Sequence, residues 1–342
     1  TELTKLRAEN AAQVEEIGKL RVRVVDVDNG SMTPSTELKK DTLEMEMKEA
    51  KSERKEKKNG SKRQRKTCEE MVTSVLFNPK LFSRPLQNGV DFLLVGEHKK
   101  TVKLKNNEWT EFKFGVYLIG DEITVTADCD GWFIKDLGQV KINTSHLWIK
   151  HHTSTIDCSG LGHHSDSGPG KGGIFTGIGK KQWYVGGGAG HGSKGAEFDL
   201  SFGCGHGKGG DVYGEETLLK QMFCGSGGGS SQNENGVWKG GRGGGIIHLV
   251  VQQQLINGGT LRCDGLDGES HAGGGGSGGS ILIQLHSSSD TCPHTLGAIS
   301  CKGGNVSGGN EGGCGRIAIY GSQISDQELK LIAPLPFCKL GK

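Results

Sequence analysis

Histidine and cysteine residues gather between positions 151 and 206, and these side chains bind zinc when four of them converge in tetrahedral geometry. The residues with a local spacing that suits a shared ion are Cys158, His163, His164, Cys204 and His206. They lack the CxxC pairs and the spacing of zinc fingers. The glycines that surround them indicate that these histidines and cysteines lie in exposed loops. We therefore expect no cofactor and keep these five positions only as candidate metal ligands.

Carboxylates suggest a second chemistry, the cleavage of a polysaccharide. Glycoside hydrolysis requires two carboxyl groups that flank the scissile bond. The candidates near expected junctions of strands and loops are Asp157, Asp166, Asp264 and Asp267. Asp264 and Asp267 lie next to glycines, where aspartate commonly stabilises a turn. We therefore expect turn residues and name no catalytic residue.

Aromatic residues beside the glycine tracts are candidates for ligand binding. Trp183, Tyr184, Tyr213 and Trp238 have this placement. Their rings would stack on a sugar or hold a peptide. The alternative is that they fill a local core.

A glycine run that leads into a short β-branched strand occurs three times, at residues 240–249, 273–285 and 312–319. Counted from the first isoleucine of each strand, Ile246, Ile281 and Ile317 are 35 and 36 residues apart. A fixed period of this length is typical of repeat architectures, in which each unit buries its apolar side against its neighbours.

A second motif is a short strand that ends in Cys-x-Gly. It recurs around Cys158, Cys263 and Cys301, with Cys224 as a looser copy. The aliphatic residue two positions before each cysteine points to the same face of the strand. Stacked repeats would therefore form internal ladders of aliphatic residues and cysteines, in which we expect reduced thiols rather than disulfides. The glycine tracts would pack closely as extended segments of polyproline II type.

These patterns predict a mainly β fold, a right-handed parallel β-helix or solenoid with glycine-rich tracts, preceded by an N-terminal coiled-coil helix. The Cys-x-Gly strand followed by GGGGSGGSI-like and GGxGRIAI-like tracts resembles glycine-rich parallel β-helix repeat proteins over about residues 155–321. This resemblance implies a fold and no catalytic residues. The layout of a coiled coil followed by a β domain is similar to tripartite-motif ubiquitin ligases, although no RING or B-box ligand pattern is present.

The N-terminal residues follow a heptad pattern, which is typical of a helix that pairs with a partner helix. Its a and d positions are Leu3, Leu6, Asn10, Gln13, Ile17, Leu20, Val24 and Val27. Asparagine at position a favours a parallel dimer, so we expect self-association as a dimer. The alternative is a helix that packs on its own domain.

The chain divides by composition into five parts. We expect a coiled-coil oligomerisation helix at 1–28, a charged linker at 29–70, a β cap or small β domain at 71–150, glycine-rich β-helix repeats at 151–322 and a C-terminal cap or tail at 323–342. The basic run at 51–66 is interrupted by glutamates and contains no aromatic residue that could stack on a base, so nucleic acid is a disfavoured partner.

Composition limits the class of protein. The 342 residues include 59 glycines and carry a formal net charge of +2. The glycines follow no strict Gly-X-Y period, which disfavours collagen. No apolar run reaches the roughly 18 residues that span a bilayer, so no membrane partner is expected. No signal-peptide pattern is seen, and we expect a cytoplasmic or nuclear protein, with an extracellular one as the alternative.

The sequence thus favours a non-enzymatic oligomeric scaffold or recognition module that binds a protein or a glycan through the face of the β-helix. One alternative is the substrate-recognition half of a larger enzyme, such as a ubiquitin ligase with its catalytic domain upstream. A polysaccharide-active β-helix enzyme is the other.

Overall fold

The structure is a computed structural model that describes residues 92–95, 100–105, 113–129, 138–176, 184–197, 205–234, 236–270, 272–286, 294–305 and 310–339. The expected coiled-coil helix at 1–28 and charged linker at 29–70 lie outside these ranges. Among the described residues, no helix has the length and apolar character needed to cross a membrane.

The described residues form mainly β structure, with one short helix near the C-terminus. In chain order the elements are β1 (Phe92–Val95), β2 (Lys100–Lys105), β3 (Lys113–Ile119), β4 (Ile123–Asp128), β5 (Gln139–Ile149), β6 (Thr155–Asp157), β7 (Phe175–Thr176), β8 (Tyr184–Val185), β9 (Gly205–His206), β10 (Ser231–Asn233), β11 (Gly236–Trp238), β12 (Ile246–Asn257), β13 (Thr260–Arg262), β14 (Ser280–Leu285), β15 (Ala298–Ser300), β16 (Arg316–Tyr320), α4 (Asp326–Leu329), β17 (Ile332–Ala333) and β18 (Phe337–Lys339).

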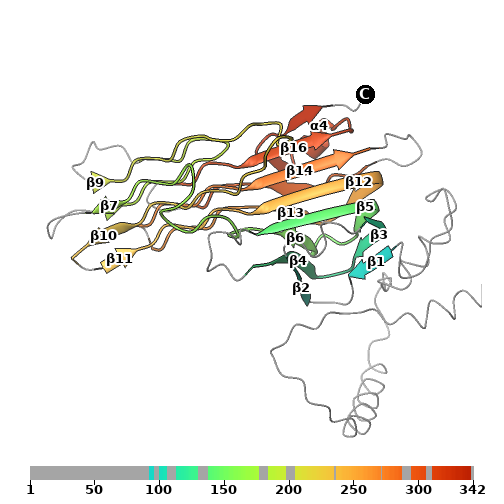
Figure 1. The fold of residues 1–342 in the computed structure, drawn as a ribbon, viewed down its shortest axis with the longest axis horizontal. Helices are drawn as coiled ribbons and strands as arrows, with labels where there is room; N and C mark the ends of the chain where they lie inside the picture. The colour runs from blue at the N-terminus through green and yellow to red at the C-terminus, as the bar shows by residue number, and fades with distance from the viewer. Residues whose placement is uncertain are drawn as a thin grey trace, which may run out of the picture.

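Two parallel sheets occupy one end of the molecule (Figure 1). One sheet has the order β1-β3-β5-β12-β14-β16-β18 and the other the order β17-β15-β13-β6-β4-β2. The ladders within both are parallel. Apart from the insertion that contains β7–β11, successive strands alternate between the sheets, so each coil of the chain adds one strand to each. The strands of residues 92–149 belong to these same two sheets.

The hydrophobic core lies between the two sheets and is built from rows of inward side chains. Ile247, Ile281 and Ile317 pair directly and form one such row, with spacings of 34 and 36 residues. Ile246 instead pairs with Ser280 and belongs to the opposite face. The sequence-based alignment of Ile246 with Ile281 was therefore wrong by one residue, because either isoleucine suits a strand and a shift of one residue reverses the face.

The predicted cysteine ladder is present in the second sheet. Cys158, Cys263 and Cys301 are buried free thiols that stack on one another at the ends of β6, β13 and β15. The ladder continues through them, since the N–H of Cys158 donates to Arg262 O at 2.8 Å. Cys224 does not belong to this ladder, and its assignment as a looser copy was wrong. No strand of the second sheet immediately precedes Cys224, and a glycine segment follows it.

The glycine tracts leave the sheets and run side by side to the far end of the molecule, where β7, β9, β10 and β11 lie (Figure 1). We call the described residues of 159–213, 223–245, 263–279 and 301–315 the glycine lattice. Along one segment of this lattice, successive N–H groups donate to carbonyls of different neighbouring segments, one after another. In the return segment 273–279, the acceptors are in order the carbonyls of Glu269, Gly229, Asn310, Leu266, Ser226, Gly313 and Cys263.

This order repeats every three residues, because every third donor bonds to the same neighbouring segment. The segment 263–269 receives the first, fourth and seventh bonds, 226–229 the second and fifth, and 310–313 the third and sixth. A repeat of three residues per turn without bonds inside the segment is the geometry of polyproline II. Each glycine segment can therefore contact neighbours on all sides, and the lattice extends in two dimensions.

Close approach of backbones explains why these positions are glycine. A Cβ placed on Gly274 would lie 2.0 Å from the carbonyl oxygen of Gly187, and one on Gly229 would lie 2.0 Å from that of Gly173. Real Cβ atoms do not approach a carbonyl this closely, so any side chain would push two segments apart. The lattice is thus held by backbone hydrogen bonds and not by a side-chain core.

Candidate functional site

The structure separates the candidate metal ligands. Cys158 points into the core between the sheets, while His163 and His164 lie on the first outward glycine segment and His206 lies in β9 at the far end. Burial and the neighbouring His164 lower the pKa of His163. Cys204 is outside the described residues. Within the described part of the chain, no group of three or more histidine, cysteine or acidic residues is placed to hold a metal ion.

The aspartates near the strand ends hold neighbouring coils together. Asp264 accepts hydrogen bonds from the Ser300 hydroxyl at 2.6 Å and from the Lys302 N–H at 2.8 Å. Arg262 links Asp264, at 3.2 Å, with Asp157, at 3.7 Å. The structure therefore brings Asp157 and Asp264 near each other across a guanidinium group.

The remaining two aspartates tie loops. The carboxylate of Asp166 accepts bonds from the N–H and the hydroxyl of Ser230, both at 2.6 Å. Asp267 accepts the N–H of Asn305 at 2.6 Å. All three bonds join segments that are far apart in the sequence, so these carboxylates link neighbouring segments of the chain.

The aromatic candidates are not brought together. Tyr213 lies at the inner end of the lattice, where its hydroxyl donates to Cys224 O. Trp238 ends β11 at the far end of the lattice and is half-buried, and the backbone of Tyr184 pairs with Gly205 in β8 and β9. Trp183 lies outside the described residues. Trp238 directly follows Val237, whose side chain is exposed.

A buried polar cluster inside the lattice was not predicted from the sequence. His191 is fully buried, and its Nδ1 donates to Gly278 O at 2.7 Å. Its ring stacks on Tyr213, with the centroids 4.5 Å apart, and its Nε2 has no hydrogen-bond partner. The pKa of His191 is lowered to about 4, mainly by burial; the bond to Gly278 opposes this shift, and the nearby Arg316 and His163 add to it. The imidazole is therefore neutral at physiological pH.

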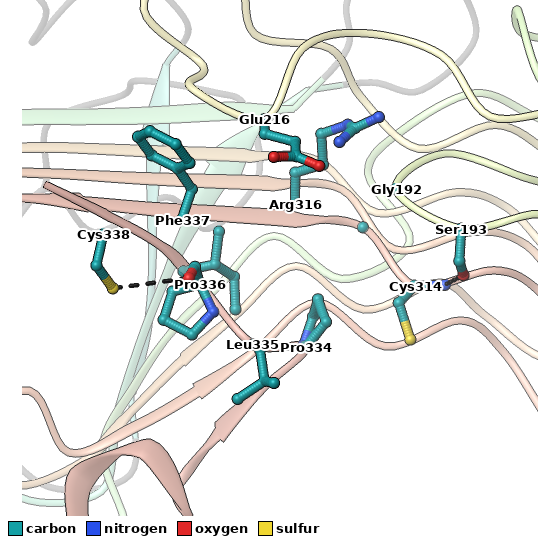
Figure 2. Close-up of a pocket in the computed structure, with 12 residues that line it drawn as sticks. Gly192, Ser193, Glu216, Cys314, Arg316, Pro334, Leu335, Pro336, Phe337 and Cys338 are labelled. Carbon is teal, nitrogen blue, oxygen red and sulfur yellow. Dashed lines mark hydrogen bonds between the residues drawn. The ribbon is translucent and has the colours of Figure 1, made fainter. Parts of the chain in front are cut away.

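The C-terminal end of the two-sheet stack carries a surface pocket of about 390 Å³. Figure 2 shows Arg316 and Glu216 on one side and Pro334, Leu335 and Pro336 on the opposite side. Its other lining residues are Gly192, Ser193, Cys314, Gly315, Ile317, Phe337 and Cys338. The only sequence signal for this pocket is the pair of prolines at 334 and 336, which marks a segment that cannot continue a regular ladder.

The Arg316 side chain is fixed at the rim of this pocket. Its Nε and Nη2 donate to Tyr213 O at 3.2 and 2.9 Å, and Nη2 also reaches Gly214 O at 3.3 Å. These bonds hold the segment 213–214 against the start of β16. Glu216, two residues after Gly214, is exposed, so the rim presents the fixed Arg316 cation and one solvated carboxylate.

Comparisons of the chain with family models, with curated proteins and with solved structures find no match.

Proposed function

We propose that the protein is a non-enzymatic oligomeric scaffold that recognises a protein or a glycan. Its architecture would be a right-handed parallel β-helix, preceded by a dimerising coiled-coil helix at 1–28. The relationship to glycine-rich parallel β-helix repeat proteins belongs to the same proposal. The helix would supply avidity by joining two rigid recognition surfaces.

The observation that carries this proposal is that hydrogen bonds of buried polar groups join segments that are far apart in the sequence. Successive coils are joined by ladders and by turn aspartates, and the lattice consumes backbone donors and acceptors in bonds between distant segments. Bonds of this kind would restrict the motion of the described segments that they join. They would hold exposed apolar side chains, among them Ile174, Val237 and Leu266, at fixed positions, and fixed apolar side chains suit recognition.

The oligomeric part of the proposal is tested by sedimentation of the full chain. We expect a dimer for the parent and a monomer for Ile17→Asp, because a charge at position a opposes pairing of the helices. Glu15→Gln, at an outward heptad position, is the matched control and should remain a dimer. A monomeric parent, or a dimeric Ile17→Asp variant, would refute the role of this helix.

The non-enzymatic part is tested against polysaccharides. We expect no release of reducing ends by the parent protein. Cleavage that disappears in the double variant Asp157→Asn/Asp264→Asn would establish the polysaccharide-active alternative and overturn the scaffold proposal. The asparagine substitutions keep the size of the side chains, so we expect the double variant to fold. An unchanged circular dichroism spectrum checks this.

A further inference from the structure

Two residues of the glycine lattice cover the backbone that leads into the pocket at the C-terminal end. The N–H groups of Gly192 and Ser193 donate to Cys314 O at 2.8 and 3.2 Å, and the Ser193 hydroxyl accepts the Cys314 N–H at 2.9 Å. The backbone of Gly192 also packs directly against Gly315 O. A ligand of this pocket is therefore recognised through side chains and not by pairing with the edge of the strand.

Arg316 brings a positive charge to the pocket that no acidic side chain neutralises. Its Nε and Nη2 bond to the carbonyls of Tyr213 and Gly214, and its Nη1 has no hydrogen-bond partner within the described ranges. Among the described residues, no carboxylate forms an ion pair with this guanidinium. The half-buried side chain is thus held in place before a ligand binds. Such a group forms a strong charge-assisted hydrogen bond with a carboxylate.

Two further polar groups and an apolar wall surround this cation. The Ser193 hydroxyl has no acceptor in the described part of the chain, so its proton is available to a ligand. The exposed Glu216 carboxylate can accept bonds from hydroxyl groups. Figure 2 shows Leu335 on the side opposite Arg316, and this leucine is 78% exposed. A fitting ligand therefore has a carboxylate, hydroxyl groups and an apolar face.

These three features occur together in an acidic sugar. A hexuronic acid carries one carboxylate, several hydroxyl groups and a pyranose ring whose C–H groups form an apolar face. The pocket, at about 390 Å³, lies near the lower end of the range for small-molecule sites, which suits a mono- or disaccharide unit. The negative charge of Glu216 opposes a doubly charged group such as a phosphate monoester.

We propose that this pocket binds the uronic-acid unit of a glycan, with the carboxylate of the sugar on Nη1 of Arg316. The hydroxyl groups of the ring then lie near Ser193 and Glu216, and its apolar face lies toward Leu335. This inference rests on the proposed recognition function and names its site and ligand class.

The probe is methyl β-D-glucuronide, titrated into the full chain and followed by amide chemical shifts in a ¹⁵N spectrum. Methyl β-D-glucoside is the matched neutral ligand, because a hydroxymethyl group replaces the carboxylate. We expect saturable shift changes at Ser193, Arg316 and Leu335 with the glucuronide. The glucoside should bind about 10-fold more weakly or worse, as for the loss of a hydrogen bond to a charged group.

Two substitutions of the same kind test the place of binding. Leu335→Asp puts a negative charge on the wall opposite Arg316, whereas Leu331→Asp puts the same charge on a leucine that does not line the pocket. Both leucines are exposed, at 78% and 56%, so we expect both variants to fold. Leu335→Asp should weaken binding of the glucuronide about 5-fold or more through repulsion of like charges. Leu331→Asp should leave the affinity unchanged.

The proposal is overturned by an absence of saturation, by equal affinities for the glucuronide and the glucoside, or by equal weakening in the two aspartate variants. Acetate that binds as tightly as the glucuronide would also overturn it, because the sugar ring would then contribute nothing. The sedimentation and reducing-end experiments on the same sample separate the two proposals. A dimer that cleaves no polysaccharide and does not bind the glucuronide refutes the uronic-acid site alone.

Discussion

The two-sheet stack and the glycine lattice are both made of extended chain, but they are stabilised in different ways. In the sheets, backbone bonds run to two neighbours, and rows of side chains such as Ile247, Ile281 and Ile317 fill the space between the layers. In the lattice, the bonds of residues 273–279 rotate among three acceptor segments. A strand repeats every two residues and bonds two neighbours, whereas a lattice segment repeats every three residues and bonds three. The additional neighbour leaves less room for side chains in the lattice.

This difference predicts opposite sensitivities. A packed core loses stability when atoms are removed, because a cavity remains. The lattice contains little that can be removed, and its stability is lost when atoms are added, because backbones already touch where a Cβ would be. Substitutions that change one methyl group in each region should therefore separate the two kinds of packing.

The largest effect is expected for Gly274→Ala, which adds one methyl group to the lattice. The new Cβ would lie 2.0 Å from Gly187 O, and that oxygen belongs to a backbone that other segments hold on several sides. We expect a loss of about 3 kcal/mol or more in the free energy of unfolding, measured by urea denaturation. A loss below about 1 kcal/mol would show that the lattice can expand and would contradict the comparison.

Gly258→Ala is the control for this substitution. Gly258 is exposed, and a Cβ there has its nearest contact at 3.0 Å, with Lys150 O. The change from glycine to alanine alters the unfolded chain equally in both variants. We expect a change of less than about 1 kcal/mol, so the difference between the two variants reports the packing of the lattice.

The next largest effect is a dependence of stability on pH that arises in the lattice. The folded pKa of His191, about 4, lies below its ordinary value of 6.5, because burial disfavours the cation and Nε2 has no acceptor. The unfolded chain therefore binds the proton more tightly. The contribution of neutral His191 is complete above pH 6.5 and is lost as the pH falls toward 4, by up to roughly 3 kcal/mol.

This dependence is measured as the urea midpoint at a series of pH values. His191→Asn is the control, since its amide can still donate to Gly278 O but does not titrate. Its stability should change less between pH 6.5 and 4 than that of the parent. Parallel pH curves for the two proteins would mean that another group controls the acid response.

A smaller effect is expected for a hydroxyl group placed in the sheet core. Cys263→Ser would bury an oxygen between Cys158 and Cys301, where burial already raises the pKa of the Cys263 thiol well above its usual range. We expect a loss of about 1–3 kcal/mol in the free energy of unfolding, and a smaller loss for Cys263→Ala. Equal losses would show that the hydroxyl finds a partner there.

The lattice differs in this respect, because some of its carbonyls accept bonds from buried hydroxyl groups. The Ser277 hydroxyl is fully buried, accepts the N–H of Ser226 at 2.8 Å and donates to Ser226 O at 3.4 Å. Serine is therefore an ordinary residue in the lattice and a foreign one in the cysteine ladder. A serine hydroxyl thus finds an acceptor in the lattice and is expected to lack one in the cysteine ladder.

Much of the repeat was predictable from the sequence, because its periodic residues are the ones that stack. The equivalence of Cys158, Cys263 and Cys301 follows from their shared motif, and the structure confirms it. The close packing of the glycine tracts follows equally from the missing Cβ. The register of Ile246 was not predictable, because adjacent isoleucines fit either face.

The candidate sites were less predictable for a different reason. The environment of His191 depends on segments 87 residues apart, and the pocket depends on where a ladder stops. Neither has a local sequence pattern. Pro334 and Pro336 mark the end of regular pairing, but the position of the pocket is set by the register of the coils that precede it.

The smallest effect is expected for Ile281→Val, which removes one methyl group from the sheet core. Ile281 is fully buried in the row that also contains Ile247 and Ile317. The row already includes a valine, since Val140 pairs with Ile247, so the layer accepts the smaller side chain at one position. We expect a loss of about 0.5–1.5 kcal/mol in the free energy of unfolding. If removal of this methyl group costs as much as its addition at Gly274, the two regions are packed by the same principle and the distinction between them fails.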